Sequence, residues 1–563
     1  MSIVPADYPP RFRASDYIVK PTAPEDERIE VGVLFVGAGP AGLAGAIRLG
    51  QLLAEDPEVA ESLGEVPIAV VDKGKGAGSH LLSGAVMRPG PFRSLFPDED
   101  HLRVPGVYGE VPGEAVYFMM RSRAIRLPTP PQLRNHGNYV VSVSQLARWM
   151  AEKAEELGAY MLGETDAQKL IVDDAGRVAG VVTGDKGRGR EGEELPTFEP
   201  GVELGAKITV LAEGTAGHLT GVLRKHYELD AAPQTYELGV KEVWEIPRPL
   251  GKVVHTLGWP LKLSPRYHEY GGSWIYPMGD DKVSIGFVTG LDYADATVSV
   301  HDLLQQFKSH KLVRGILEGG RRLAWGAKTI PGGGFYALPR RLHVPGALLA
   351  GDSAGFVNMS ALKGVHYAIQ SGILAAEAIY DALKRGNATA PAGLWNYDRS
   401  IHESFIWTDL WRERNVRPAF QKSFFVGAVV GGMATATRGK LPKHIGHEAD
   451  AQVPVFMGDR TSAYPKPDGQ YFFDKLSSVF ASGNKTRDDQ PNHIRVQEHV
   501  PVELATLWVN MCPAHVYELG EGDGEIVDVH INASNCVQCG AITAKGGRLT
   551  PPEGGSGPEY TIT

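Results

Sequence analysis

A continuous apolar run at residues 31–36, VGVLFV, begins the regular pattern of the chain. A run this short, with no polar alternation, predicts a strand that is buried on both faces, as in a parallel sheet. The next residues, LAGAIRLGQLL, have helical spacing, and a second apolar run, VPIAVVD, begins at residue 66. Strand, helix and strand in this order predict an α/β fold built on a βαβ unit.

The pattern changes further along the chain. Alternating, β-branched and aromatic positions dominate residues 235–300, for example TYELGVKEVWEI and DKVSIGFVTGLDY. They predict a sheet beside the first domain, as a substrate-binding insert would require. The stretch 345–383 then predicts a strand, a glycine-rich loop and a long helix. The chain of 563 residues is long enough for several packed units.

Charge and composition exclude several classes of protein. The formal net charge of −9 argues against a nucleic-acid-binding protein, which would need a basic face. All three cysteines lie beyond residue 510, and an odd, clustered set does not suit a disulfide framework, so we expect a reducing compartment. The chain lacks an apolar run of about 18 residues, and its first thirty residues lack the apolar core of a signal peptide. We therefore expect neither a transmembrane helix nor a secretory leader.

A nucleotide site is predicted where the first strand meets the first helix. Gly37 would permit the turn, Gly39 would let the backbone approach a pyrophosphate, and Gly42 would let helix pack on strand. The helix start adds free N–H groups and partial positive charge. Asp72, at the end of the second strand, would accept hydrogen bonds from the ribose. The alternative is a glycine-rich turn without a ligand.

Two later signals favour FAD over NAD. An apolar strand in TVLAEGTAGHLT breaks into a turn at Gly214, and Gly351-Asp352 follows another strand just before the long helix. An acid in that place suits a ribityl chain and a flavin phosphate, although Asp352 could instead be a helix N-cap. With the first motif, this order resembles the large FAD-containing family that includes glutathione reductase, hydroxylases and geranylgeranyl reductases.

The three cysteines suggest an iron–sulfur site. Cys512 precedes a proline, and Cys536 and Cys539 form a Cys-x-x-Cys pair, which is similar to bacterial ferredoxin ligation. Short glycine-rich loops can wrap a cluster and direct backbone N–H groups at its sulfurs. A zinc site would normally need four ligands, and no suitably spaced His or Cys completes one.

At this point the resemblance becomes specific. The order of the FAD motifs, YPKPDG (464–469), DQP (489–491), CPA (512–514) and PPEGGSGPEY (551–560) together resemble the electron transfer flavoprotein–ubiquinone oxidoreductases. The resemblance extends from about residue 30 to residue 560. It implies FAD and a four-iron cluster in one polypeptide, with four Cys ligands to the cluster.

This chain departs from that family at one ligand. The Cys-x-x-Cys-x-x-Cys run would require Cys at position 542, and the chain has Ile542. Three outcomes stay open: a 3Fe-4S cluster on the three cysteines, a 4Fe-4S cluster with an oxygen or exogenous fourth ligand, or no cluster. In the last case the loop would hold three free thiols.

The resemblance also implies a quinone site and a membrane surface. It places Gly271-Gly272 in the quinone pocket, where glycines would let a flat ring approach the backbone; a turn or bulge is the alternative. Residues 424–433 form an apolar stretch too short to span a bilayer. Basic residues flank it, as expected of a segment that dips into one leaflet while cations meet headgroups, although an ordinary buried helix has the same pattern. These flanking residues are Arg414, Arg417, Lys422, Arg438, Lys440 and Lys443.

We therefore predict an α/β FAD-binding, glutathione-reductase-like fold with an α+β quinone-binding insert and a C-terminal ferredoxin-like iron–sulfur domain. The predicted order is a first FAD-binding part at 30–234, a quinone-binding domain at 235–325, a second FAD-binding part at 326–410, a membrane-surface segment at 411–444 and an iron–sulfur domain at 445–563.

The resemblance implies an electron-transferring-flavoprotein dehydrogenase. Reduced electron transfer flavoprotein would donate electrons and ubiquinone or menaquinone would accept them, with no catalytic side chain required because the cofactors carry the chemistry. Two other functions share part of the pattern: a FAD-dependent lipid reductase or hydroxylase of the geranylgeranyl reductase type, and a flavin-bound, non-catalytic membrane adaptor. The expected location is peripheral, on the cytoplasmic face of a bacterial inner membrane or on the matrix face of the mitochondrial inner membrane.

Overall fold

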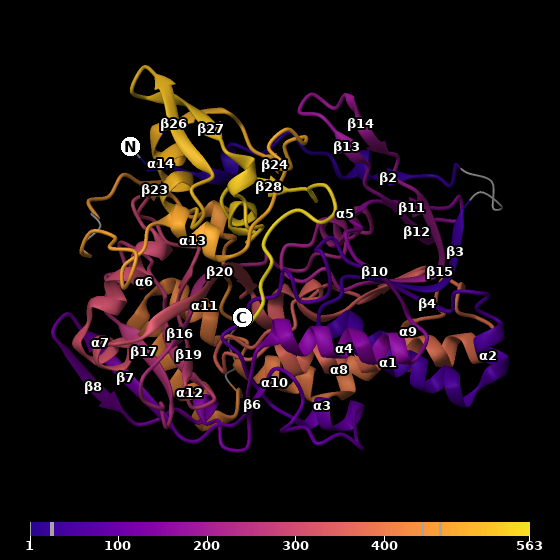
Figure 1. Ribbon diagram of the computed structural model, residues 1–563, viewed down its shortest axis with the longest axis horizontal. Coiled ribbons are helices and arrows are strands. Elements are labelled where there is room, and N and C mark those ends of the chain that lie inside the picture. The colour runs from indigo at the N-terminus through magenta and orange to yellow at the C-terminus, as the bar shows by residue number, and fades with distance from the viewer. Residues whose placement is uncertain (1, 23–27, 441–443, 461–463) are drawn as a thin grey trace.

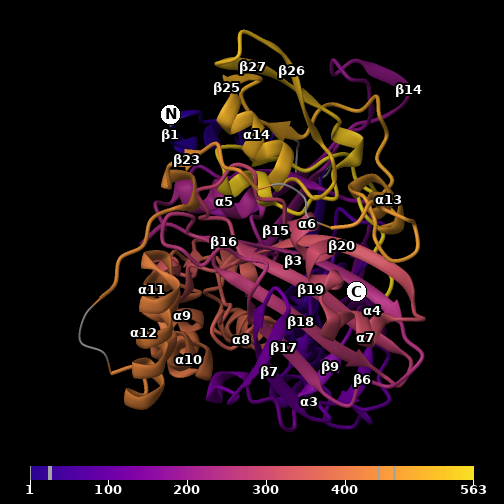
Figure 2. The same cartoon turned by 90° about the vertical axis from the view of Figure 1, so that its left-hand side faces the viewer.

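The computed structural model describes residues 2–22, 28–440, 444–460 and 464–563. Two large sheets lie side by side, and the C-terminal elements lie above both of them (Figure 1). A group of helices near residues 395–437 lies at the lower left of Figure 2, away from the C-terminal elements. The sites are built where the two sheets and the C-terminal elements meet.

The first sheet has a parallel centre. β3 (Ile29–Val36) pairs in parallel with β4 (Ile68–Val71) on one side and with β15 (Glu203–Leu211) on the other. The apolar run at 31–36 is buried along its whole length, as predicted for a strand covered on both faces. The nine strands are completed by β10 (Tyr160–Leu162), β12 (Val178–Thr183), β11 (Ala167–Val172), β2 (Ile18–Val19), β22 (Ala347–Leu349) and β21 (His343–Val344).

Three helices pack together against this sheet: α1 (Pro40–Glu55), α4 (Val143–Glu156) and α8 (Val365–Lys384) (Figure 1). α1 and α8 approach closely because Gly372 has no side chain. A Cβ atom there would lie 2.2 Å from the carbonyl oxygen of Ala41. This contact fixes the start of α1 against the first half of the long helix.

The second sheet is mostly antiparallel and has seven strands. α6 (Val300–Ser309) packs on it, and α7 (Lys311–Leu317) follows α6. Large buried side chains, including Trp244, Phe287 and Trp325, form its core. The strand order is β20 (Arg321–Pro331), β16 (Tyr236–Glu245), β19 (Lys282–Gly290), β18 (Gly271–Met278), β17 (Val253–Gly258), β7 (Glu114–Met120) and β8 (Arg123–Leu127).

The strands of this sheet come from a wider part of the chain than residues 235–325. β7 and β8 form a hairpin from residues 114–127, and β7 joins the sheet by parallel pairing with β17. β20 continues to Pro331. A hairpin in one part of the chain and strands more than a hundred residues later thus make one sheet.

The C-terminal region shares a core with the second sheet. Trp508 and Cys512 belong to the same buried cluster as Trp244 and Phe287. The region is therefore packed onto the sheet. Its elements are α13 (Lys475–Ala481), β24 (Ile494–Arg495), β25 (His499–Pro501), α14 (Val502–Met511), β26 (Tyr517–Gly522), β27 (Ile526–Ile531), the short 3₁₀ turns η8 (Ala533–Asn535) and η9 (Ala541–Ala544), and β28 (Arg548–Leu549).

Four helices lie together at the lower left of Figure 2: α9 (Trp395–Glu403), α10 (Phe405–Glu413), α11 (Val416–Lys422) and α12 (Phe424–Thr437). α12 contains the apolar stretch 424–433, which lies within the predicted membrane-surface segment 411–444. Within the described ranges, no helix combines the length and the hydropathy that a bilayer crossing needs.

Candidate functional site

A single cavity of about 380 Å³ lies between the two sheets. Strand ends and loops of the first sheet form one side of it, and strands β16 to β20 form the other. Gly42 does not line the cavity, since it lies further along α1. The predicted residues that do line it are Gly37, Gly39, Asp72, Gly214, Gly271, Gly272, Gly351 and Asp352.

The three glycines of the first motif have different surroundings. Gly37 has a φ of +112°, which a side chain would strain, and its N–H donates to Val71. A Cβ atom on Gly42 would lie 2.1 Å from the carbonyl oxygen of Gly37. The nearest atom to a Cβ on Gly39 is 3.8 Å away, so Gly39 presents bare backbone to open space in the cavity. Gly37 and Gly42 are thus required by the backbone itself, whereas the contact of Gly39 with a pyrophosphate stays a prediction.

Asp72 holds the glycine loop in place. Its carboxylate accepts a hydrogen bond from the N–H of Ala38 and another from the N–H of Gly74, both at 2.8 Å. Burial raises the pKa of Asp72, although both hydrogen bonds oppose this shift. Each carboxylate oxygen has capacity for a further bond. A ribose contact by Asp72 therefore stays a prediction.

Two helices begin at the cavity without a side-chain cap. α1 begins after Gly39 and α8 begins after Gly364, and both glycines line the cavity. The first N–H groups of a helix have no partner within the helix and carry partial positive charge. Two uncapped helix starts in one cavity suit an anionic or carbonyl-rich ligand such as a dinucleotide.

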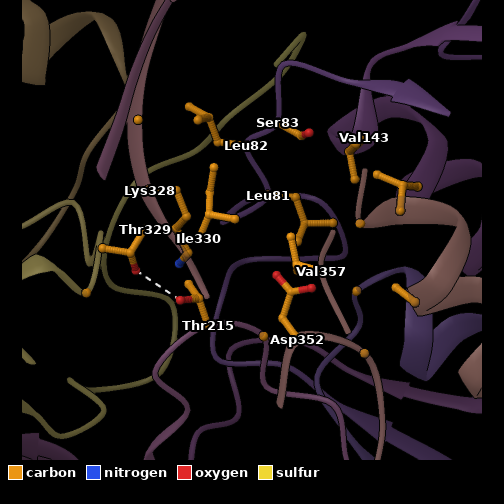
Figure 3. A pocket seen from close by; sticks show the side chains of 18 of the residues that line it. Leu81, Leu82, Ser83, Val143, Thr215, Lys328, Thr329, Ile330, Asp352 and Val357 are labelled. Atoms are coloured by element: carbon orange, nitrogen blue, oxygen red, sulfur yellow. Dashed lines mark hydrogen bonds between the residues drawn. The ribbon is translucent and has the colours of Figure 1, made fainter. Parts of the chain in front are cut away.

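Charged side chains add to this environment. Figure 3 shows the Asp352 carboxylate pointing into the cavity, with Lys328 on another wall. Burial raises the pKa of Asp352 to about 6, and burial together with the nearby Lys73 lowers the pKa of Lys328 to about 8. The sequence does not predict Lys328 as a site residue, because nothing in its local sequence indicates that its side chain reaches the nucleotide cavity.

The glycine pair Gly271-Gly272 begins β18. A Cβ atom on Gly271 would lie 2.0 Å from the carbonyl oxygen of Val288, and one on Gly272 would lie 2.2 Å from that of Thr256. The neighbouring strands β19 and β17 thus already require glycine at both positions. Both residues also line the cavity, so the predicted quinone contact remains compatible with their structural role.

His255 is a further residue that the sequence does not predict, and it lines the cavity beside that glycine pair. It lies on β17, is buried, and its Nε2 atom is 2.7 Å from the hydroxyl of Tyr276. No described residue forms a hydrogen bond with its Nδ1 atom. Burial, followed by the charge of Lys363, lowers the pKa of His255 to about 3, so the ring is neutral near pH 7.

The three cysteines meet at a second, smaller cavity. Cys512, Cys536 and Cys539 line it together with Tyr517 and Ile542. None of the three thiols forms a disulfide. The N–H groups of Ala514 and Val516 donate to the sulfur of Cys512, and that of Gln538 donates to Cys536, each at 3.4 Å. N–H groups directed at sulfur are typical of iron–sulfur ligation.

The residues present fit a cluster better than a single ion. Among the described residues, no group of three His, Cys, Asp or Glu side chains is placed to hold one metal ion. The ligands of a cluster bind different irons and stand further apart, so three thiols around one cavity suit it. Burial, and then the neighbouring Cys512, raise the pKa of Cys539 to about 12. Iron binding would replace the thiol protons.

The two cavities share a wall. Gly540 and Leu549 line both of them. The Thr329 hydroxyl and N–H both donate to the carbonyl oxygen of Cys539 at 2.8 Å, and the Thr215 and Thr329 hydroxyls are 3.0 Å apart (Figure 3). The Lys328 ammonium donates to the carbonyl of Gln538 at 3.1 Å. The cysteine loop is therefore fixed directly to the nucleotide cavity.

The predicted basic flank of α12 needs one correction. Arg417 is buried and does not meet headgroups. Its guanidinium bonds to Glu237 at 2.6 Å and to Asp292 at 2.9 Å, and it lies over the ring of Tyr270, a cavity residue. Lys422, Arg438 and Lys440 are exposed, and Arg414 is half-buried, whereas Lys443 lies outside the described residues. Two buried carboxylates would be unpaired without this arginine.

The fold is that of a FAD-dependent oxidoreductase. A solved structure described as geranylgeranyl bacteriochlorophyll reductase-like, from Thermoplasma acidophilum, matches with a TM-score of 0.54 and 17% identity. The match covers 75% of this chain and 95% of that chain. At this identity the similarity concerns the fold alone.

Sequence comparisons are more specific. Residues 236–330 match the family model described as ETF-QO, ubiquinone-binding, and residues 469–561 match the electron transfer flavoprotein-ubiquinone oxidoreductase, 4Fe-4S model. The mitochondrial electron transfer flavoprotein-ubiquinone oxidoreductase of Oryza sativa subsp. japonica is 38% identical over 98% of this chain and 96% of its own length. The Homo sapiens protein of that name is 39% identical over 94% of this chain and 89% of its own. The chain belongs to the electron transfer flavoprotein–ubiquinone oxidoreductase family.

This membership confirms the predicted family, the oxidoreductase function, and the two cofactors, FAD and an iron–sulfur cluster. It also confirms an FAD-dependent oxidoreductase fold that carries an iron–sulfur domain of this family. The glutathione-reductase-like subclass and the ferredoxin-like form of the last domain stay predictions. So do the domain boundaries and the role of each site residue.

Proposed function

We propose that this protein transfers electrons from reduced electron transfer flavoprotein to a quinone at a membrane surface, using FAD in the larger cavity and a cluster on the three cysteines. One observation carries the proposal most directly. The predicted nucleotide residues Gly37 and Asp352 and the predicted quinone residues Gly271 and Gly272 line the same cavity, and the wall of that cavity adjoins the cysteine loop.

The protein's own residues would act by binding and positioning. Gly39 and the starts of α1 and α8 would receive the phosphates and the polar edge of the cofactor. Thr329 and Lys328 hold the cysteine loop against the cavity. Bound FAD can accept one or two electrons, so it joins a one-electron donor to the two-electron reduction of a quinone.

His255 supplies the polar group that a quinone oxygen would need. When Tyr276 donates its hydroxyl hydrogen to Nε2, Nδ1 carries the remaining ring hydrogen and is a buried donor to which no described residue bonds. A buried donor without a partner costs free energy, and a quinone oxygen would relieve that cost. His255 would thus position the quinone next to the glycine pair.

The proposed membrane surface consists of α12 and the β7–β8 hairpin. Phe425 is 68% exposed and Val429 is 62% exposed, and with Met433 they form one stripe along α12. Met120 and Ile125 are exposed on the hairpin, next to exposed arginines at 121, 123 and 126. Apolar side chains surrounded by cations are typical of a surface that enters one leaflet.

The two parts of this surface lie next to each other. The Phe118 and Phe424 rings are 6.3 Å apart, and Gln132 donates a hydrogen bond to Thr435. Arg417 connects the adjoining helix α11 to the second sheet, through Glu237 on β16 and Asp292 just after β19. A lipid-soluble substrate would therefore enter near a surface that is rigidly tied to its site.

The identity of the quinone and the side of the membrane belong to this proposal. The family model that matches residues 236–330 is described as ubiquinone-binding, which favours ubiquinone as the acceptor. Menaquinone is the alternative. We propose a peripheral attachment without a spanning helix. The named relatives are mitochondrial, which favours the matrix face over the cytoplasmic face of a bacterial inner membrane.

A photoreactive azidoquinone tests the quinone site directly. The holoprotein in vesicles would be labelled under light, digested, and mapped by mass spectrometry with and without excess ubiquinone analogue. We expect competable labelling of peptides from 253–278, which contain His255 and Gly271-Gly272. Competable labelling confined to other peptides would refute this placement of the quinone.

A further inference from the structure

One expected cysteine ligand of an iron–sulfur cluster is absent from this chain. Cys536 and Cys539 are three residues apart, and the next step of a Cys-x-x-Cys-x-x-Cys run falls on Ile542. Ile542 lies on the short turn η9 and lines the same small cavity as the three sulfurs. The structure thus places an aliphatic side chain where the ferredoxin-type spacing would place the next thiolate.

Tight apolar packing surrounds Ile542. Its side chain is only 4% exposed. A Cβ atom on Gly547 would lie 2.5 Å from Ile542 Cγ1 and 2.7 Å from Val496 Cγ1. Leu549 also lines the cavity. A water molecule or small anion needs polar partners to be held in such a place, and these side chains provide none.

The described residues that line the cavity offer little else as a ligand. Apart from the cysteines, they are aliphatic or small, with the exceptions of the Met511 thioether and the Tyr517 phenol. No His, Asp or Glu is among them. The chain contains only three cysteines, so no thiolate from elsewhere can complete the set. Among these described residues, only Tyr517 has a side-chain oxygen that could bind a fourth iron. An experiment therefore has to test whether Tyr517 is a ligand.

We propose that Cys512, Cys536 and Cys539 hold a three-iron, four-sulfide cluster, with Ile542 filling the corner that a fourth iron would occupy. Each iron then receives one thiolate and three sulfides, so the ligand set is complete. The matching family model is described as 4Fe-4S, and this chain would differ from that description in cluster type. The inference concerns the cluster alone and does not depend on which quinone is reduced.

Spectroscopy of the wild-type holoprotein gives the first test. A cluster of three ferric ions has an odd electron count and gives an EPR signal when oxidised, whereas an oxidised four-iron cluster is silent and gives its signal only after reduction. We expect protein purified without oxygen to show the oxidised-state signal, with an iron-to-FAD ratio of about three. Whole cells frozen before lysis should show the same signal, which excludes loss of iron during purification.

Three variants make the test specific. Ile542→Cys should become a four-iron protein, with its signal moved to the reduced state and its iron-to-FAD ratio raised to about four. Ile542→Val keeps an apolar side chain and should remain a three-iron protein. Tyr517→Phe removes the phenol and should also keep three irons.

The opposite results would overturn the proposal. These are an oxidised wild type that is silent and gains its signal on reduction, a wild type without iron, or a change of cluster type in Tyr517→Phe. A four-iron wild type that lost an iron in Tyr517→Phe would identify the phenol as the fourth ligand. Because the deciding readout is the oxidation state in which the EPR signal appears, and not quinone reduction, failure here is distinguishable from failure of the proposed electron transfer.

Discussion

The carbonyl oxygen of Cys539 accepts hydrogen bonds from both the N–H and the hydroxyl of Thr329, each at 2.8 Å. These residues are 210 positions apart in the chain. The same Thr329 hydroxyl is 3.0 Å from that of Thr215 at the cavity. A predicted cluster ligand is thus held by the strand that lines the predicted flavin site, so two cofactors bound there would be close neighbours.

Substitution of Gly39 should weaken FAD binding without disturbing the fold. A Cβ atom on Gly39 meets nothing nearer than 3.8 Å, so Gly39→Ala should fold, but its methyl group would enter the space meant for the pyrophosphate. We expect the dissociation constant for FAD, measured by equilibrium dialysis, to rise by about tenfold, which corresponds to about 1.4 kcal/mol.

Gly42→Ala is the matched variant for this experiment. Its Cβ atom would lie 2.1 Å from a backbone oxygen, so thermal stability should fall even in the flavin-free protein. Gly39→Ala should leave the melting temperature of the flavin-free protein unchanged. If Gly39→Ala retained FAD as tightly as the wild type, this loop would not bind the phosphates.

Loss of the His255 ring should impair the reaction with quinone alone. In His255→Asn the Nδ1 donor is lost or displaced, so we expect kcat/KM for a short-chain ubiquinone to fall about tenfold. The flavin spectrum and the rate of flavin reduction by electron transfer flavoprotein should not change. His499→Ala, on the surface of the C-terminal region, is the control. Equal slowing of flavin reduction would contradict a role at the quinone.

Charges on α12 should abolish membrane binding. Phe425→Asp with Val429→Asp places two carboxylates on the exposed stripe, and these residues are too exposed to be needed for folding. Loss of two apolar side chains that would insert into the membrane should weaken binding to anionic vesicles by about a hundredfold or more. Vesicle co-sedimentation measures this. Phe480→Asp is the matched control, since Phe480 is 88% exposed on α13. Similar losses in both proteins would refute α12 as the membrane surface.

The buried Arg417 should make stability depend on pH. Burial opposes ionisation of Asp292, but Arg417 holds its pKa below the ordinary value. The lowered pKa of Asp292 contributes to the free energy of unfolding. This contribution is fully present when the pH is above the ordinary carboxyl pKa, and it is lost as the pH falls through the lowered pKa of Asp292. In Arg417→Met, Asp292 and Glu237 are buried without their cation, so their pKa values should rise and folding should become less favourable as pH increases.

The destabilisation caused by Arg417→Met should therefore grow between pH 5 and pH 8. We expect a loss of about 3–5 kcal/mol in the free energy of unfolding near neutral pH. Thermal melts across this range measure the trend. Arg321→Met breaks an exposed pair with Glu245 and should cost no more than about 1 kcal/mol at any pH in the range. A loss in Arg417→Met that was the same at pH 5 and pH 8 would contradict this assignment.

The sequence predicts what local geometry determines. The predicted uses of Gly37, Gly39 and Gly42 follow from a strand, a tight turn and a helix that are consecutive in the chain, and the structure has Gly37 at positive φ and Gly42 packed against it. The spacing of the three cysteines likewise indicates a cluster, because a short loop alone brings Cys536 and Cys539 together. The same short spacing also locates Ile542 at the next ligand position.

Long-range packing determines what the sequence could not show. The sequence around Lys328 and around His255 does not indicate that these two side chains line one cavity with the glycine loop at Gly37 and Gly39. Arg417 looks like a headgroup-binding cation in its own segment, and only the carboxylates of Glu237 and Asp292, over a hundred residues away, explain its burial. The β7–β8 hairpin similarly joins a sheet whose other strands begin at residue 236.

Stopped-flow absorbance of the bound flavin tests the proposed electron transfer most directly. The holoprotein in vesicles would be bleached without oxygen by reduced electron transfer flavoprotein and then mixed with a short-chain ubiquinone. We predict that the oxidised flavin spectrum returns within the time of one catalytic turnover. Quinol should form in proportion to the flavin that is reoxidised. A flavin that the reduced flavoprotein failed to bleach, or that stayed bleached in excess quinone, would contradict the proposed function.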